Sequence, residues 1–214
     1  YGPDGQEKTR YQGGASAWAE NMDLMFTFRG IPCIYYGSEI EFKKDVPIDV
    51  GPNAPLDKTG RAYFGDHLEG SVTASDYGKY TASGTVASTL DAPLSKHLEK
   101  LNQIRRAVPA LQKGQYTTDS NYVSGNMAYI RRYTNSSEGV DSLACVTISG
   151  NATFKGLPNG TYIDAVTGDK KVVTGGTLST SGVSGKGNMR VYVLQNSGSE
   201  VNGAIGDTGL TYLK

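Results

Sequence analysis

Thr27-Phe28-Arg29-Gly30-Ile31-Pro32-Cys33-Ile34-Tyr35-Tyr36-Gly37-Ser38-Glu39 is the stretch that decides the predicted fold. It combines the end of a helix, a turn, a short apolar run and a glycine-hinged loop that carries a carboxylate. In the run over 31–36, both faces of the predicted strand are apolar. This is typical of a strand covered on both faces in a parallel α/β sheet. We therefore predict a buried strand there, with Glu39 beyond its carboxyl end, where such folds keep their binding groups.

The residues before this strand predict a helix. Between Gly14 and Phe28, apolar side chains recur at three- and four-residue spacing, as in one face of a helix. These residues are Ala15, Trp18, Met22, Met25 and Phe26. Gly30 and Pro32 then stop the helix, so that helix and strand form one αβ unit.

Residues 38–91 show no clear periodicity and contain Pro47, Pro52 and Pro55 among many Gly, Ser and Thr residues. A segment of this length without regular structure is usually functional in a compact domain. We predict a long loop after the strand, with a short helix near Ser75–Tyr80.

A second helix is predicted over 92–107, with Asp91 as its cap, Pro93 in its first turn and Pro109 after its end. After Leu111 the pattern changes to short apolar runs between turn residues, which predicts strands. The predicted strands are 113–118, 126–134, 142–148, 152–155, 160–166, 170–174 and 189–195.

The spacing of these strands favours an antiparallel sandwich of about 80 residues. Residues 196–209, rich in Gly, Ser, Asn and Asp, predict a linker. Cys33 and Cys145 lie far apart in apolar runs, so we expect free, buried thiols. His67 and His97 have no partner at ligand spacing, and the sequence predicts no metal site.

The composition excludes some classes of function. The 214 residues carry no formal net charge and the pI is near 6.9, so neither a nucleic-acid partner nor an anionic membrane is expected. No apolar run approaches the roughly 20 residues that span a bilayer. The first five residues are polar and turn-like, and they do not resemble a secretory leader.

The strand motif resembles the last barrel strand of the α-amylase family of glycoside hydrolases, with its Gly-x-Pro-x-Ile-Tyr-Tyr-Gly-x-Glu pattern. Leu101–Arg106, followed by Pro109-Ala110-Leu111 and Gly114, is similar to the family's final barrel helix running into a C-terminal β domain. Gly160–Asp164 with Thr167-Gly168 resembles a hairpin of that domain. The likeness extends over residues 14–195.

This resemblance implies an α/β plus all-β fold. Residues 1–111 would be the C-terminal part of a (β/α)8 TIM barrel, and 112–195 an antiparallel β-sandwich of Greek-key type. Residues 196–214 would be a linker or the start of a further module. A complete barrel takes about 250 residues, so only its last part would lie here. The family's nucleophilic aspartate, general-acid glutamate and stabilising aspartate lie on earlier strands, and no catalytic residue is assigned in this chain.

The resemblance also implies substrate-binding residues. Tyr36 and Glu39 would lie at the mouth of the barrel, where Glu39 orients arginines or sugar hydroxyls, or else makes a structural salt bridge. Asp57 and Arg61 resemble a pair that binds donor-side sugar in many relatives, with a solvated loop pair as the alternative. The tryptophan that often follows in the family is absent here.

Four aromatic side chains in the long loop region are candidates for stacking on a sugar ring, with ordinary packing as the alternative. They are Tyr63, Phe64, Tyr77 and Tyr80.

The implied parent is a secreted, extracellular enzyme that degrades starch by cleaving α-1,4-glucosidic bonds with retention, through carboxylates outside this chain. Its partners would be starch or malto-oligosaccharide and the rest of the parent enzyme, with no nucleic acid and no membrane. No cofactor is expected in this chain; calcium is common in the family and would belong to the full-length parent. We expect this chain alone to be inactive. The alternatives are a non-catalytic carbohydrate-binding sandwich over 112–195 and a purely structural domain.

Overall fold

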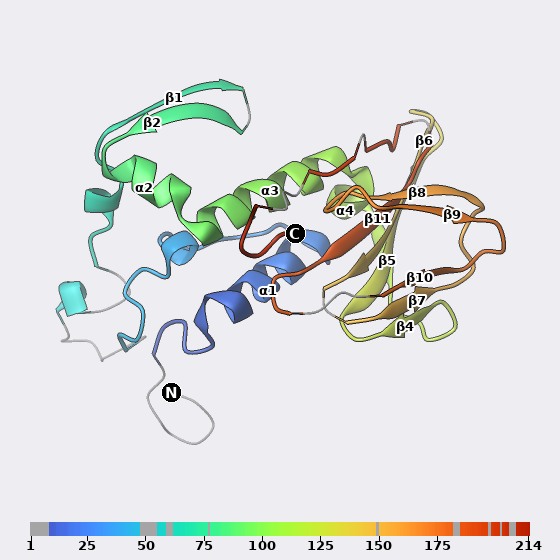
Figure 1. The fold of residues 1–214 in the computed structure, drawn as a ribbon, viewed down its shortest axis with the longest axis horizontal. Helices are drawn as coiled ribbons and strands as arrows, with labels where there is room; N and C mark the ends of the chain where they lie inside the picture. The colour runs from blue at the N-terminus through green and yellow to red at the C-terminus, as the bar shows by residue number, and fades with distance from the viewer. Residues whose placement is uncertain are drawn as a thin grey trace.

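The computed structural model of the chain describes residues 9–47, 55–58, 62–76, 78–148, 150–181, 185–196, 198–201, 203–205 and 209–214. Helices cover one face of a six-stranded antiparallel sheet, and a three-stranded antiparallel sheet packs on its other face (Figure 1). A β-hairpin and several loops extend from the helical side, away from the sheets (Figure 1). No helix in the described parts is long and apolar enough to span a bilayer.

The two predicted helices are present. Helix α1 spans Gly14–Thr27 and helix α3 spans Pro93–Ala107, and both bury their apolar face in one core. A short helix, α4, follows at Pro109–Lys113. The prediction that Asp91 caps α3 was wrong, because helix α2 (Thr85–Asp91) extends to that residue and Ala92 takes the capping position.

The predicted buried strand over 31–36 was also wrong in this structure. The segment has no regular secondary structure over 31–35, enters a turn at Tyr36 and belongs to no sheet, and Ile31 is 94% exposed. Cys33 is exposed too, which corrects the expectation that both thiols are buried; Cys145 is buried. A strand needs neighbours for its backbone N–H and C=O groups, and in the described chain no other strand pairs with this segment.

The long loop region contains more structure than predicted. Three single turns of 3-10 helix lie at Ser38–Ile40 (η1), Leu56–Lys58 (η2) and Gly65–His67 (η3). Strands β1 (Ser71–Asp76) and β2 (Lys79–Ser83) form a hairpin where a short helix was predicted. The correction has a local reason: Val and Thr residues favour a strand, and Gly78 supplies the positive φ that the turn requires.

The six-stranded sheet contains most of the predicted strands, in the order β3-β5-β6-β11-β8-β9. Its members are β3 (Gln115–Thr117), β5 (Ala128–Asn135), β6 (Val140–Thr147), β8 (Gly160–Asp164), β9 (Lys170–Val173) and β11 (Arg190–Leu194). The smaller sheet has the order β10-β7-β4, from Leu178–Thr180, Ala152–Phe154 and Val123–Gly125. Strands β4 and β10 were not among the predicted strands.

Successive side chains along a strand of the larger sheet point to opposite faces, so each strand contributes to two separate hydrophobic cores. In β11, Val191 and Val193 face the helices, whereas Tyr192 and Leu194 face the smaller sheet. The helix-facing core also contains residues of α1, α3 and α4, so it crosses the predicted boundary at 111/112. The antiparallel sandwich and the helices therefore share one sheet.

Buried Arg131 of β5 joins the two parts with charged hydrogen bonds. Its Nη1 donates to the Thr27 carbonyl at the end of α1, and its Nη2 to the Gly114 carbonyl, both at 2.8 Å. Burial lowers the pKa of this guanidinium. These bonds satisfy carbonyls that a helix end and a strand start leave without partners.

The described residues of the predicted C-terminal linker are packed against the fold. Val201 and Leu213 are buried in the helix-facing core, and the Ile205 N–H donates to the Ala165 carbonyl at 2.7 Å. The Tyr212 ring lies edge-on to His97, with centroids 5.9 Å apart. The few apolar side chains of this polar segment are what attach it, since their burial is favourable.

Candidate functional site

The turn at Tyr35–Glu39 has a conformation that requires glycine. Gly37 has φ +80°, and a Cβ atom there would lie 2.5 Å from Cβ of Phe42. The Phe42 N–H donates to the Gly37 carbonyl at 2.8 Å, which closes the turn. Glycine alone allows this sharp reversal, which places Tyr36 and Glu39 on a tight, well-defined loop as the motif predicted.

Tyr36 belongs to an aromatic cluster. Its ring lies 5.7 Å from that of Phe64 and 6.4 Å from that of Phe42, and its hydroxyl donates to the Ala62 carbonyl at 3.3 Å. His67 stacks on Phe64 at 5.1 Å, with an interplanar angle of 23°. The cluster ties the loop at 62–67 to the turn, and Tyr36 remains partly exposed at its edge.

Glu39 lines a cavity of about 250 Å³ between η1, α3 and the end of the β-hairpin. Polar groups of Tyr80, Ser95, Glu99 and Asn102 contribute to the same cavity. The Ser95 hydroxyl lies within hydrogen-bond distance of the Glu39 carbonyl oxygen, at 3.4 Å. The role of Glu39 in binding substrate stays a prediction, and the structure places beside it groups from helix α3 that only folding brings there.

Two carboxylates, Glu39 and Glu99, line this cavity, but Glu99 already has hydrogen-bond partners. It accepts bonds from the Tyr80 hydroxyl at 3.3 Å and from the Gln103 amide at 3.1 Å. The pKa of Tyr80 is raised, first by burial and then by the negative charge of Glu99. The polar groups that line the cavity can form hydrogen bonds, and we do not assign it a hydrolytic carboxylate pair.

The other predicted residues are not brought together by the described structure. Asp57 is exposed in η2, while Arg61 lies outside the described residues, so their pairing stays a prediction. Of the aromatic candidates, Tyr63 is 77% exposed and Phe64 is buried in the aromatic cluster. Tyr80 lies in the hairpin against Glu99 and Tyr77 lies outside the described residues.

Sequence reasoning missed a buried pair between the helices. His97 of α3 places Nε2 2.9 Å from Oδ1 of Asp23 and 3.1 Å from the Ala19 carbonyl oxygen of α1. Burial raises the pKa of Asp23 from 3.8 to about 7, an effect that His97 partly opposes. Asp23 lies on the apolar face of its helix. A charged residue at such a position was the feature of the sequence that could have indicated a buried polar pair.

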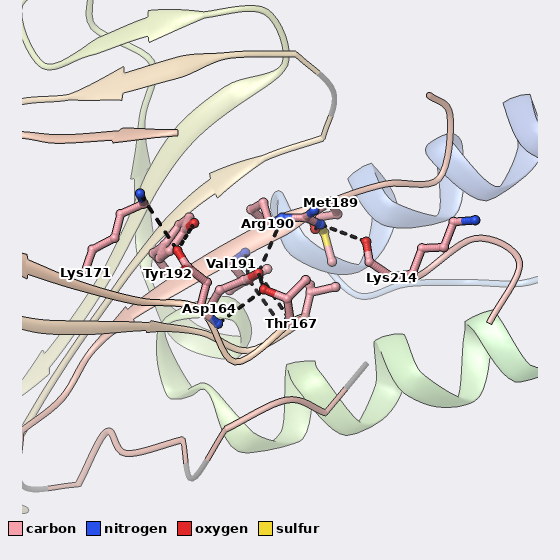
Figure 2. Close-up of polar contacts among 10 residues, drawn as sticks. Asp164, Thr167, Lys171, Met189, Arg190, Val191, Tyr192 and Lys214 are labelled. Atoms are coloured by element: carbon pink, nitrogen blue, oxygen red, sulfur yellow. Dashed lines mark hydrogen bonds and ion pairs between the residues drawn. The ribbon is translucent and has the colours of Figure 1, made fainter. Parts of the chain in front are cut away.

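A second buried carboxylate, Asp164, organises the hairpin of β8 and β9 (Figure 2). Its Oδ1 accepts the N–H groups of Val166 and Val191 at 3.1 and 2.8 Å. Its Oδ2 accepts the N–H and hydroxyl of Thr167 at 3.1 and 2.6 Å. Nε of Arg190 lies 3.6 Å from Oδ2. Burial raises the pKa of Asp164, and these bonds oppose the rise; they give the carboxylate a structural role.

The residues described by the structure include no group of three or more His, Cys, Asp and Glu side chains that could hold a metal ion. The donor set for calcium, several oxygen ligands around one point, is therefore not found in these parts. Calcium stays a prediction for the full-length parent.

No protein-family model matches the chain, and no curated protein does. Solved structures match in part, and those matched with the highest probability are α-amylase family glycoside hydrolases. An α-amylase from Anoxybacillus is 17% identical, over 85% of this chain and 33% of its own, with a TM-score of 0.49. A cyclomaltodextrin glucanotransferase is 18% identical, over 86% and 34%, with a TM-score of 0.45.

A trehalose-6-phosphate hydrolase from Bacillus licheniformis is 17% identical, over 92% of this chain and 40% of its own, with a TM-score of 0.41. This chain thus spans between a third and two fifths of the length of these three structures. At TM-scores below 0.5, the matches assign neither an activity nor a substrate to it.

Proposed function

We propose that this chain is the C-terminal part of an α-amylase-type glycoside hydrolase. The observation that carries the proposal is the segment over 31–36, between helix α1 and the Gly37 turn. It has the family's strand motif, is apolar, and has no strand partner in the described chain. Such a segment suits a strand whose neighbours belong to the rest of a parallel barrel.

The arrangement downstream supports the same proposal. Helix α3 follows the loop region and runs directly, through α4, into the antiparallel sandwich. That order corresponds to a last barrel helix followed by a C-terminal β domain. Independent action of the sandwich is not favoured, because its larger sheet shares a core with α1 and α3.

The chemistry of the parent follows as part of the proposal. It would be a secreted enzyme that cleaves α-1,4-glucosidic bonds of starch, and its catalytic carboxylates would lie outside this chain. Retention of configuration requires two carboxyl groups about 5–5.5 Å apart, one acting as nucleophile and one as acid and base. Tyr36, Glu39 and the loop that carries Asp57 would contribute to the substrate-binding face of that cleft.

The proposal is tested by an assay of reducing ends with soluble starch. The full-length parent should turn over at ordinary enzyme rates of about 1–1000 per second, and nuclear magnetic resonance should show product with the α configuration. The 214-residue chain alone should show no turnover. Turnover by the isolated chain, or none by the parent, would reject the proposal.

The proposed role of Asp57 and Arg61 in binding sugar has its own test. Arg61→Ala in the parent should lower kcat/KM roughly ten- to a hundredfold, because a lost hydrogen bond to a charged group is worth about 1.5–3 kcal/mol. Lys170→Ala, in strand β9 of the sandwich, is the charge-matched control and should leave kcat/KM unchanged. Equal kinetics in both variants would show that Arg61 does not bind substrate.

A further inference from the structure

A cavity of about 270 Å³ lies between the larger sheet and the connections of the smaller one, at the edge formed by strand β3. We call it the sandwich cavity. Its lining residues all lie between positions 115 and 157, so it is separate from the segment 31–36 and from the Glu39 cavity. A cavity with an apolar base and a few polar groups is typical of small-molecule sites.

The base of the sandwich cavity is one face of the larger sheet. Gln115 of β3 lies opposite Arg132 of β5, which lies opposite Leu143 of β6. Thr117 lies opposite Ile130 in the same pair of strands. Alternate residues of a strand share a face, so these five side chains belong to one face. Ile130 and Leu143 are part of the core between the sheets and make the base apolar.

The opposite wall is held by the backbone of two turns. The Tyr122 N–H donates to the Asp119 carbonyl at 2.9 Å, and the Lys155 N–H donates to the Tyr122 carbonyl at 2.8 Å. Gly156 has φ +68°, and a Cβ atom there would lie 3.1 Å from Cδ1 of Tyr122. The Tyr122 ring therefore lies against this turn, where only glycine leaves it room. A wall fixed in this way loses little entropy when a ligand binds.

The charges around the sandwich cavity have one sign. Among its described lining residues, Arg132 and Lys155 are cationic and none is acidic. Arg132 uses Nε and Nη2 for Asp141, at 2.9 and 2.8 Å, which leaves Nη1 outside that pair. In the part of the chain that the structure describes, no carboxylate forms an ion pair with Lys155. The lining thus offers two charged donors to an anion.

We propose that the sandwich cavity binds an aromatic carboxylate. The ring would lie between Tyr122 and the apolar base, because aromatic and aliphatic side chains both favour an aromatic ring. The carboxylate would accept hydrogen bonds from Nη1 of Arg132 and Nζ of Lys155. This ligand is an anion, unlike the neutral sugars of the proposed function, and the site does not depend on that function.

The test is a titration of the 214-residue chain with benzoate at constant ionic strength, followed by nuclear magnetic resonance. Signals of Tyr122 and of the Gly156 amide should shift and saturate. Benzamide has the same ring without the charge, and acetate has the charge without the ring. Each should bind at least tenfold more weakly than benzoate, because each lacks one of the two contacts.

Two pairs of variants separate the charge from the ring. Lys155→Gln removes a cation and should weaken benzoate binding at least tenfold, whereas Lys170→Gln, at an exposed position of β9 outside the lining, should stay within twofold. Tyr122→Ala removes the aromatic wall and should also weaken binding at least tenfold, whereas Tyr122→Phe keeps the ring and should stay within twofold. Circular dichroism checks the fold, and Lys155→Gln remains informative if Tyr122→Ala does not fold.

The outcomes that overturn the inference are distinct from those that bear on the proposed enzyme. An absence of saturable shifts with benzoate would overturn it, as would equal binding of benzamide or of acetate. Equal affinities in Lys155→Gln and Lys170→Gln would overturn it too. Hydrolysis of starch by the parent without benzoate binding rejects only this site, and benzoate binding without hydrolysis by the parent rejects only the proposed enzyme.

Discussion

Two apolar runs of similar length, 31–36 and strand β11, lie in opposite environments in this molecule. Strand β11 pairs with β6 on one side and β8 on the other, and its Val193 is fully buried. The segment 31–36 pairs with no strand in the described chain, and Ile31 is almost fully exposed. Apolar composition alone therefore does not make a strand; available partners for the backbone do.

The helical region and the sandwich also differ in how many hydrogen bonds their buried carboxylates accept. In the sandwich, Asp164 accepts bonds from two valine N–H groups and from Thr167. Between the helices, Oδ2 of Asp23 has no hydrogen-bond partner in the described structure, and one His97 nitrogen faces both Oδ1 and a carbonyl oxygen. Of these two carboxylates, the one in the sandwich therefore has the more complete set of hydrogen-bond donors.

The largest effect is expected at Asp164. Asp164→Ala leaves two buried N–H groups, and the partly buried N–H and hydroxyl of Thr167, without their acceptor. It should cost at least about 3 kcal/mol of unfolding free energy. Urea denaturation measures the loss. Asp164→Asn keeps one acceptor oxygen and should cost less than the alanine variant. A loss below about 1 kcal/mol in Asp164→Ala would mean that the sandwich does not depend on this network.

Arg131 tests whether the two regions form one unit. Arg131→Met removes the bonds to the Thr27 and Gly114 carbonyls and should cost about 2–3 kcal/mol. Arg132→Met is the matched control, since Arg132 pairs with Asp141 on the surface, where such a pair is worth about 1 kcal/mol or less. Equal losses in the two variants would contradict the joining role of Arg131.

The helix pair predicts a pH dependence with a defined sign. Between pH 3.8 and about 7, unfolded chains have lost the Asp23 proton while folded chains keep it. The unfolding free energy should therefore fall as pH rises through this window, by up to about 1.4 kcal/mol per pH unit from this group. Asp23→Asn cannot titrate.

The measurement compares urea midpoints of the original chain and Asp23→Asn from pH 4.5 to 7.5. The difference between the two proteins reports on Asp23 together with its contact to His97, because groups distant from this pair titrate alike in both. Stability of the original chain should decline relative to the variant as pH rises. Parallel curves would show that the carboxyl does not keep its proton in the folded chain.

The smallest effect is expected at Ile31. In this chain Ile31→Ala should change the unfolding free energy by less than about 0.5 kcal/mol. Val193→Ala removes two buried carbons and should cost about 2 kcal/mol. In the full-length parent, a cost for Ile31→Ala similar to that of Val193→Ala would show that the segment becomes a buried strand there. An unchanged parent would contradict the barrel part of the proposal.

Sequence alone predicted the elements that carry their own pattern. Helix α3 has a clear apolar stripe from Leu94 to Ile104, and strands such as β5 and β6 are long and bounded by turn residues. The Gly37 turn and a carboxylate after it were also predicted. The helix expected at Ser75–Tyr80 failed, because a few residues with a turn-forming glycine between them do not distinguish a helical turn from a hairpin.

Other features of the candidate site could not be predicted from the sequence. The Glu39 cavity takes Tyr80 from the hairpin and Ser95 from α3, and a second cavity is lined by Trp18 of α1 and by Tyr35 from the turn. No local pattern reports which side chains of different elements face each other. Such sites become visible only when distances between elements are known.

The sequence by itself determined the two main helices, most strands of the sandwich and the glycine at the turn, because periodicity and backbone freedom are properties of neighbouring residues. Only the tertiary structure decided that 31–36 joins no sheet in the described part of the chain, that Asp23 meets His97, that Arg131 joins α1 to the sheet, and that Leu213 enters the core. These outcomes depend on hydrogen-bond partners and on loss of solvent, which residues distant in the chain supply. The apolar sequence of a segment does not indicate whether such partners exist.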